Sequence, residues 1–239
     1  IYTLSLHDAL PIFINAHGLN TLQAGAMLAV MGLWSIVAGA QAHVMAAKLT
    51  PAGVIQLGLV IEIIAVALVA VLMPVGLSVW WQLIPMAAYG LGLGFASAQL
   101  TSVVLSEVPI MQSGEGSATQ STVRQLGTAV GSAISGASLA MAVNGTLPAR
   151  LESLGLPAKV GDGLAQAVSG SAGGVIGVFR NGDGPAARFG DEAPKIADAM
   201  TSGFIEGGQW TLLVAGIMLF IGLLASVAVR RAASSHNVR

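Results

Sequence analysis

Residues 54–73 read VIQLGLVIEIIAVALVAVLM, a run about one bilayer long in which the sole ionisable residue is Glu62. A helix needs about 20 apolar residues to cross the hydrocarbon core, because each residue advances it by about 1.5 Å. Thirteen of these positions are Val, Ile or Leu. Each favours insertion by about 0.3 to 0.6 kcal/mol, against a cost of about 3 kcal/mol for one carboxylate. The stretch therefore predicts a transmembrane helix.

The rest of the chain repeats this character. It is 54% hydrophobic and 9% charged, whereas soluble domains carry about 25% charged residues. The net charge of −1 offers no bulk attraction for nucleic acid. We therefore expect an all-α membrane protein whose partner is the lipid bilayer. The five predicted transmembrane helices cover about 22–46, 54–73, 80–104, 116–143 and 209–229, so that residues 13–143 hold four of them.

The distribution of basic and aromatic residues predicts the orientation. Arg230, Arg231 and Arg239 follow the last predicted helix, and the positive-inside rule then makes the 230–239 tail cytoplasmic. We expect a multi-pass protein of the plasma (inner) membrane, in which the loops at 47–53 and 105–115 are also cytoplasmic. Trp80, Trp81 and Trp210 then fall at the external ends of their helices, as an interfacial belt requires.

The 144–208 segment is predicted to be a long external loop before the last helix. It is rich in Gly, Ala, Ser and Asp, although 157–168 and 193–206 have the pattern of short amphipathic helices. Two interpretations remain open: an external cap over a substrate path, or a tolerated and mobile insertion.

Arg124 stands out, because it lies inside the predicted helix 116–143. An arginine near the bilayer centre costs about 2.5 to 3.5 kcal/mol, so such residues usually face protein or water and mark functional sites. Arg124 either snorkels to the headgroups or pairs with Glu107 or Glu115 as an internal gate, which is our preferred interpretation. Glu62 is either a proton carrier or a neutral, hydrogen-bonded residue between helices, and we keep it as a coupling candidate.

Polar and small residues recur at helical spacing along 116–143, which predicts a hydrophilic face toward a cavity or another helix. The cavity-lining candidates are Gln120, Gln125, Thr128, Gln99, Tyr89 and Trp34. Two glycine pairs, Gly90 with Gly94 and Gly127 with Gly131, have the spacing that lets helix backbones approach closely or lets a helix bend.

The sequence offers no pattern for an enzyme. It lacks cysteine, and its four histidines are not spaced as metal ligands. A nucleophile elbow, a His-Glu metal motif and paired carboxylates are also absent. We therefore expect no catalytic residue, no metal and no cofactor.

From about 13 to 229 the chain resembles the C-terminal half of the fourteen-helix drug:H+ antiporters of the major facilitator superfamily. The matching stretches are His17-Gly18-Leu19 with Ala24-Gly25, Tyr89 to Phe95 (YGLGLGF), Gly114 to Ala118 (GEGSA) and Thr122 to Gly131 (TVRQLGTAVG). Their order, with Arg-Gln-Leu-Gly near the start of a helix, is more specific than any one glycine.

The resemblance implies that the five predicted helices are helices ten to fourteen of a transporter. The first, third and fourth would line its cavity, and the second and fifth would support it. One departure is the segment between Gly39 and Thr50, which keeps Lys48 but lacks the acidic residue of the family's loop motif. We also expect a fragment without its N-terminal half, because residues 3–12 resemble a translated sequencing adapter and 1–12 read as an artefact.

The function that the resemblance implies is proton-coupled efflux of small hydrophobic or cationic solutes by alternating access. Its partners would be protons, those solutes and the missing N-terminal half of the same transporter. One alternative is a non-transporting integral membrane scaffold, and another is a major facilitator transporter for a different small solute.

Overall fold

The computed structural model describes residues 12–74, 78–106 and 108–236, with side chains to Arg231. All regular elements in these ranges are helical, and five are long and apolar enough to cross a membrane, which confirms the all-α membrane fold. The elements are η1 (Ile12–Ala16), α3 (Thr21–Leu49), α4 (Pro51–Leu72), η2 (Val79–Gln82), α5 (Leu83–Ser106), η3 (Ile110–Gln112), α6 (Ser113–Ser153), α7 (Ala158–Gly170), α8 (Gly174–Asn181), η4 (Gly184–Glu192) and α9 (Ala193–His236).

Local sequence explains where α3 and α4 begin. Asn20 caps α3, accepting a hydrogen bond from the Gln23 amide while the Gln23 side chain accepts one from the Asn20 amide. At the α3–α4 turn, Thr50 has a φ of 67° and accepts a hydrogen bond from the Gly53 amide. Pro51 follows at the first position of α4, where its missing N–H is not needed.

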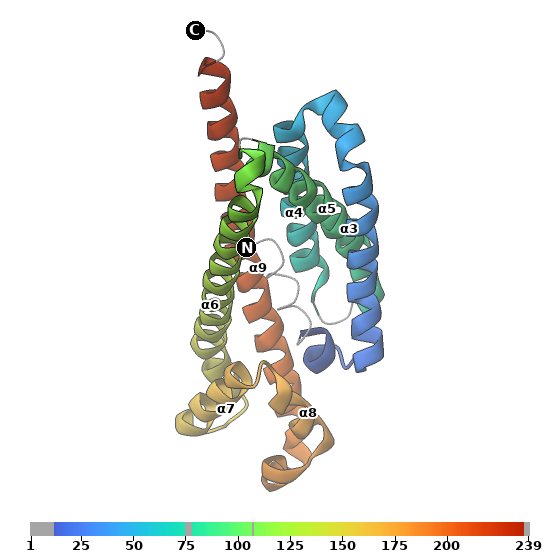
Figure 1. Ribbon diagram of the computed structural model, residues 1–239. Helices are drawn as coiled ribbons and strands as arrows, with labels where there is room; N and C mark the ends of the chain where they lie inside the picture. The colour runs from blue at the N-terminus through green and yellow to red at the C-terminus, as the bar shows by residue number, and fades with distance from the viewer. Residues whose placement is uncertain (1–11, 75–77, 107, 237–239) are drawn as a thin grey trace.

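Helices α3, α4 and α5 form a tight bundle with α5 in contact with both neighbours (Figure 1). Their backbones meet at glycines. A Cβ on Gly90 would lie 2.2 Å from the carbonyl oxygen of Met31, and one on Gly94 would lie 2.3 Å from that of Ser35. Between α4 and α5, a Cβ on Gly58 would lie 2.6 Å from the carbonyl oxygen of Gly92. Such contacts exclude any side chain larger than hydrogen at these positions.

Helices α6 and α9 are longer than a bilayer requires. They contain 41 and 44 residues, or about 60 and 65 Å of helix, against a hydrocarbon core of about 30 Å. The helix expected to end at 143 continues to Ser153, and the helix expected to begin at 209 begins at Ala193. Both added stretches lie at the end of the molecule that carries α7 and α8 (Figure 1).

Residues 144–208, called the cap below, are a folded helical unit rather than an irregular loop. The cap comprises α7, α8, η4 and the adjoining ends of α6 and α9. It has an apolar interior because one side of each of its helices is buried. The fully buried members include Leu147, Leu151, Ile176, Phe179, Met200 and Phe204. One ion pair, between Arg150 of α6 and Glu206 of α9, lies on its surface.

The two ends of the molecule carry different elements. The α3–α4 and α5–α6 connections lie at the same end as the C-terminus, whereas η1 and the cap lie at the other (Figure 1). Trp80 and Trp81 of η2 and Trp210 of α9 are exposed. Which of the two ends faces the cytoplasm stays a prediction.

The segment before α3 is attached to the cap by polar contacts. The Asn15 amide donates to the Ala172 carbonyl (2.9 Å), and the Arg180 guanidinium donates to the Ala16 carbonyl (3.3 Å) and to the Thr201 hydroxyl (3.2 Å). His17 lies at this junction, before the first spanning helix. Burial lowers its pKa, and an interaction with the Met73 backbone partly opposes this shift.

We expect this junction to lose stability in acid. Because the pKa of His17 is lowered in the folded protein, the stability due to neutral His17 is fully present above its ordinary pKa of about 6.5. That stability is lost as pH falls from there through the folded value, since the unfolded state binds more protons. The protection factors of the η1 and α8 amides in the intact protein, which correct for the slower intrinsic exchange in acid, should therefore be lower at pH 5.5 than at 7.5. His17→Gln should remove most of this difference, and an unchanged acid response would contradict the assignment.

Candidate functional site

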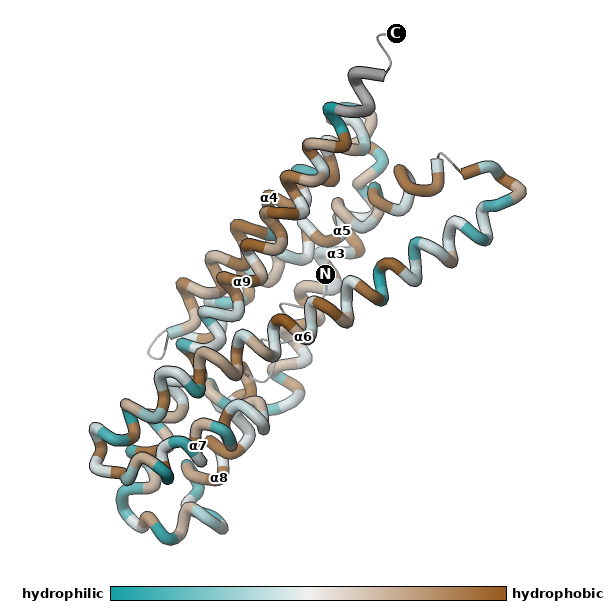
Figure 2. Tube along the Cα trace, turned by 90° about the vertical axis from the view of Figure 1, so that its left-hand side faces the viewer, coloured by the Kyte–Doolittle hydropathy of each residue, from teal (hydrophilic) through white to brown (hydrophobic). Residues whose placement is uncertain are grey.

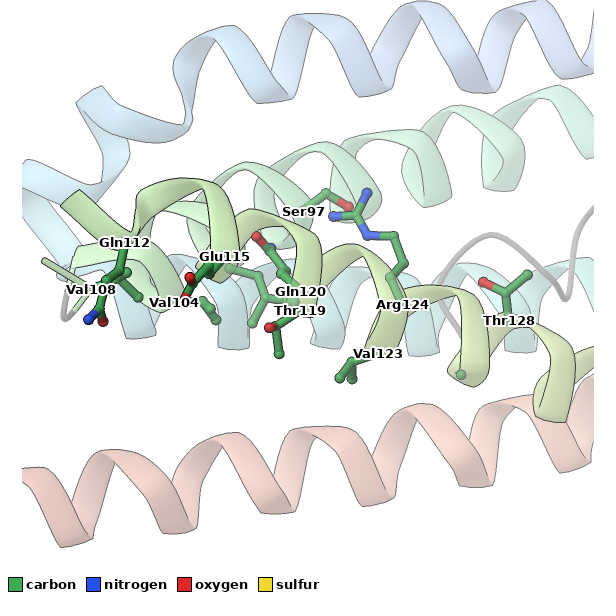
Figure 3. A pocket seen from close by; sticks show the side chains of 13 residues that line it. Ser97, Val104, Val108, Gln112, Glu115, Thr119, Gln120, Val123, Arg124 and Thr128 are labelled. Carbon is green, nitrogen blue, oxygen red and sulfur yellow. The ribbon is translucent and has the colours of Figure 1, made fainter. Parts of the chain in front are cut away.

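A cavity of about 690 Å³ lies between α5 and α6, close to the connection between these helices (Figure 3). Pockets for small organic ligands typically measure about 300 to 1,000 Å³. One wall comes from α5 and the connection that follows it, and the other comes from the first half of α6. The lining residues are Ser97, Leu100, Val104, Val108, Gln112, Glu115, Gly116, Thr119, Gln120, Val123, Arg124, Gly127 and Thr128.

The cavity exists because α6 diverges from α5. Helix α6 packs mainly on α9 and α7, and its fully buried residues Val143, Leu147 and Leu151 all lie toward the cap. Toward the other end, α6 separates from the remaining helices (Figure 2). The Gln120 side-chain amide donates a hydrogen bond to the Thr101 hydroxyl of α5 there (3.0 Å).

Arg124 lines this cavity with a free guanidinium. Its side chain is exposed and makes no hydrogen bond or ion pair with the described residues. It extends from α6 on the side away from α9 (Figure 3). Apolar side chains, including Val123 and Leu100, share the lining with it. The site therefore combines one unpaired cation with largely apolar walls.

The expected pair between Arg124 and Glu115 does not form in this structure. Nine residues separate them, or two and a half helical turns, which places them about 13 Å apart along the axis and on opposite sides of α6. Glu115 lies in the first turn of α6 and also lines the cavity. Glu107, the other proposed partner, lies outside the described residues.

The remaining cavity candidates fall into two groups. Gln120 and Thr128 line this cavity beside Arg124. Gln125 is exposed on α6 but is not among the lining residues. The others lie elsewhere: Tyr89 and Gln99 are buried on α5, and Trp34 is exposed on α3.

Among the glycine candidates, Gly127 lines the cavity and Gly131 is half-buried one turn further along α6. The resemblance implies that α5 helps to line a cavity, but the residues that do so here, which include Ser97 and Val104, were not among the candidates. These residues show no distinctive pattern in the sequence, since the angle between α5 and α6 decides which of them face the cavity.

Glu62 lies away from this cavity, in the interior of the bundle. It is fully buried on α4, and neither carboxylate oxygen has a hydrogen-bond partner among the described residues. The expectation of a hydrogen-bonded Glu62 is therefore not met. Its Cγ instead packs close to Gly92 of α5, where a Cβ would lie 2.8 Å away. An unsatisfied buried polar group typically costs about 1 to 3 kcal/mol.

Metal chemistry has no support in the described part of the chain. Within residues 12–74, 78–106 and 108–236, no three His, Cys, Asp or Glu side chains are grouped so that they could hold a metal ion.

Comparison with known proteins gives one informative similarity. No family model matches the sequence, and no solved structure matches it. Over 223 residues the chain is 25% identical to a tetracenomycin C resistance and export protein of Streptomyces glaucescens. The alignment covers 91% of this chain and 39% of that protein, so the chain spans about two fifths of its relative's length.

Proposed function

We propose that this chain is the C-terminal helix bundle of a membrane exporter that moves small, largely apolar organic molecules. The observation that carries the proposal is the cavity between α5 and α6, which has the volume of a small-ligand site and mixed polar and apolar walls. The similarity to an antibiotic resistance and export protein supports the same class of activity.

Alternating access is the mechanism that suits this architecture. In such transporters, helix groups rock against each other around a central site. The glycine contacts make α3, α4 and α5 one tightly packed group, whereas α6 is attached chiefly to α9 and the cap. The exposed first half of α6 would then face the rest of the transporter, which we expect upstream of this chain.

We further propose that the exporter is a fourteen-helix drug:H+ antiporter of the plasma (inner) membrane. The cytoplasmic end would be the one with the C-terminus, where Arg230 and Arg231 follow the last apolar stretch. The cavity would then accept its substrate from the cytoplasmic side. Proton entry would supply free energy for export, because one charge that crosses 100 mV yields about 2.3 kcal/mol.

The test uses the intact gene in an efflux-deficient host. We expect the wild type to lower the accumulation of fluorescent dyes and a protonophore to abolish that effect. Thr128→Trp should reduce efflux at least about tenfold, because the indole would project into the cavity beside Arg124 and compete with a ligand for that space. Met141→Trp is the matched control on α6, since Met141 is exposed, does not line the cavity and lies outside the first half of the helix.

Each alternative predicts a different result. If the wild type exports none of the tested compounds at a normal membrane level, the scaffold interpretation gains support. If both tryptophan variants export equally well, transport does not use this cavity. Export that a protonophore leaves unchanged would contradict proton coupling but not export itself.

A further inference from the structure

We propose that the cavity between α5 and α6 selects molecules with an anionic oxygen group, such as a carboxylate or phenolate, on an apolar body, and that Arg124 binds this group. The inference rests on the proposed function, because it names the substrate class of the same site. Within the proposed class of small apolar molecules, the site would bind acids more tightly than the corresponding esters and amines.

The first argument is the unpaired charge. Arg124 is the sole cation among the residues that line the cavity, and it has no ion-pair partner among the described residues. A guanidinium carries five N–H donors in a planar fork that matches a carboxylate in two-point geometry. Arg124 is exposed in this chain, and it would lose water where the rest of the proposed transporter covers the cavity. A buried charge without a partner is costly, so a ligand anion would then supply the counter-charge that the described residues do not.

The second argument is the setting of that charge. Leu100, Val104 and Val123 supply apolar surface to the same cavity. A ligand that only formed an ion pair would leave this surface in contact with water, and a ligand that was only apolar would leave Arg124 unpaired. A molecule with a ring system and one acidic group satisfies both. The Gln120 side chain, fixed by its bond to Thr101, adds a polar group beside the arginine.

Glu115 raises the opposite possibility, a cationic ligand. Glu115 is exposed in the first turn of α6, at the start of the spanning segment, where water can solvate its carboxylate. Arg124 lies about 13 Å deeper along the helix, where an uncompensated charge costs more. The energetic gain from a counter-charge is therefore larger at Arg124, and the structure favours the anion.

The experiment measures binding to the purified intact protein with three fluorescent probes on one ring system: anthracene-9-carboxylate, its methyl ester and 9-(aminomethyl)anthracene. We expect the wild type to bind the carboxylate at least about tenfold more tightly than the ester, as a charge-assisted hydrogen-bonded pair predicts. Arg124→Gln should remove this preference and leave the ester's affinity unchanged. Arg124→Lys should retain part of it, because the charge remains while the fork is lost.

Three results would overturn the inference. Equal binding of acid and ester by the wild type removes the proposed selectivity. An equal loss of all three probes in Arg124→Gln assigns the arginine a structural role. Preference for the amine that disappears in Glu115→Gln assigns the charge recognition to Glu115. Transport of the same probes into inverted vesicles is scored separately, so acid-selective binding without transport contradicts the proposed function but not this inference.

Discussion

Replacing Gly90 with alanine is expected to push α3 away from α5 and to destabilise the membrane bundle. The added Cβ would lie 2.2 Å from the Met31 carbonyl oxygen and 3.0 Å from its carbon. Both atoms belong to the backbone of α3, so no rotamer change can relieve the overlap. The helices must separate, and overpacking of this kind costs about 1 to 3 kcal/mol, occasionally more. We expect the upper part of that range, because separation weakens the whole α3–α5 contact.

Gly32→Ala and Gly136→Ala are the matched controls. A Cβ at either position would meet no atom within 4 Å, and alanine is favoured over glycine in a helix interior by up to about 1 kcal/mol. These variants should be neutral or slightly stabilised. Thermal unfolding of the intact protein in detergent gives the comparison, and equal midpoints for Gly90→Ala and Gly32→Ala would refute the close backbone contact.

The membrane helices could be predicted because insertion depends on a local sum of side-chain transfer energies. The side chains of residues 54–73 give a favourable total transfer free energy without help from any other segment. The structure places α4 at Pro51–Leu72. The length of α6 and α9 could not be predicted in the same way. Residues beyond about 143 are not apolar enough to indicate a span, and their helical state depends on packing between Leu147, Phe204 and their neighbours from distant segments.

The individual residues that line the candidate site were predictable on one wall only. The helical spacing of Gln120, Arg124 and Thr128 placed them on a common face, and they share the cavity. The opposite wall depends on the angle at which α6 leaves α5, and no periodicity encodes an interhelical angle. The proposed pairing of Arg124 with Glu115 neglected helical phase, since nine residues place two side chains on opposite sides of a helix.

Replacing Phe204 with alanine is expected to open the cap while the membrane helices stay intact. Phe204 is fully buried in the cap interior. Its ring packs directly on the backbone of Gly173, where φ is +84° and a Cβ would lie 2.6 Å from the ring. Truncation of a buried phenylalanine costs about 3 to 5 kcal/mol, through lost burial and the cavity that remains. That loss is large for a unit of about 65 residues, since native stability is about 0.05 to 0.15 kcal/mol per residue.

Phe220→Ala provides the control, because it makes the same chemical change on the same helix at a side chain that is 51% exposed. Amide exchange should rise throughout α7 and α8 in Phe204→Ala and stay unchanged in Phe220→Ala. Equal protection in the two variants would show that the cap does not depend on its buried core.

Efflux by Phe204→Ala then separates the two interpretations of the cap. If the cap covers a substrate path, its opening should change the export rate even though Phe204 lies far from the cavity between α5 and α6. If the cap is a tolerated insertion, export should match the wild type while exchange in α7 and α8 rises. Because α6 carries both the cavity wall and part of the cap core, through Leu147 and Leu151, we expect the first result.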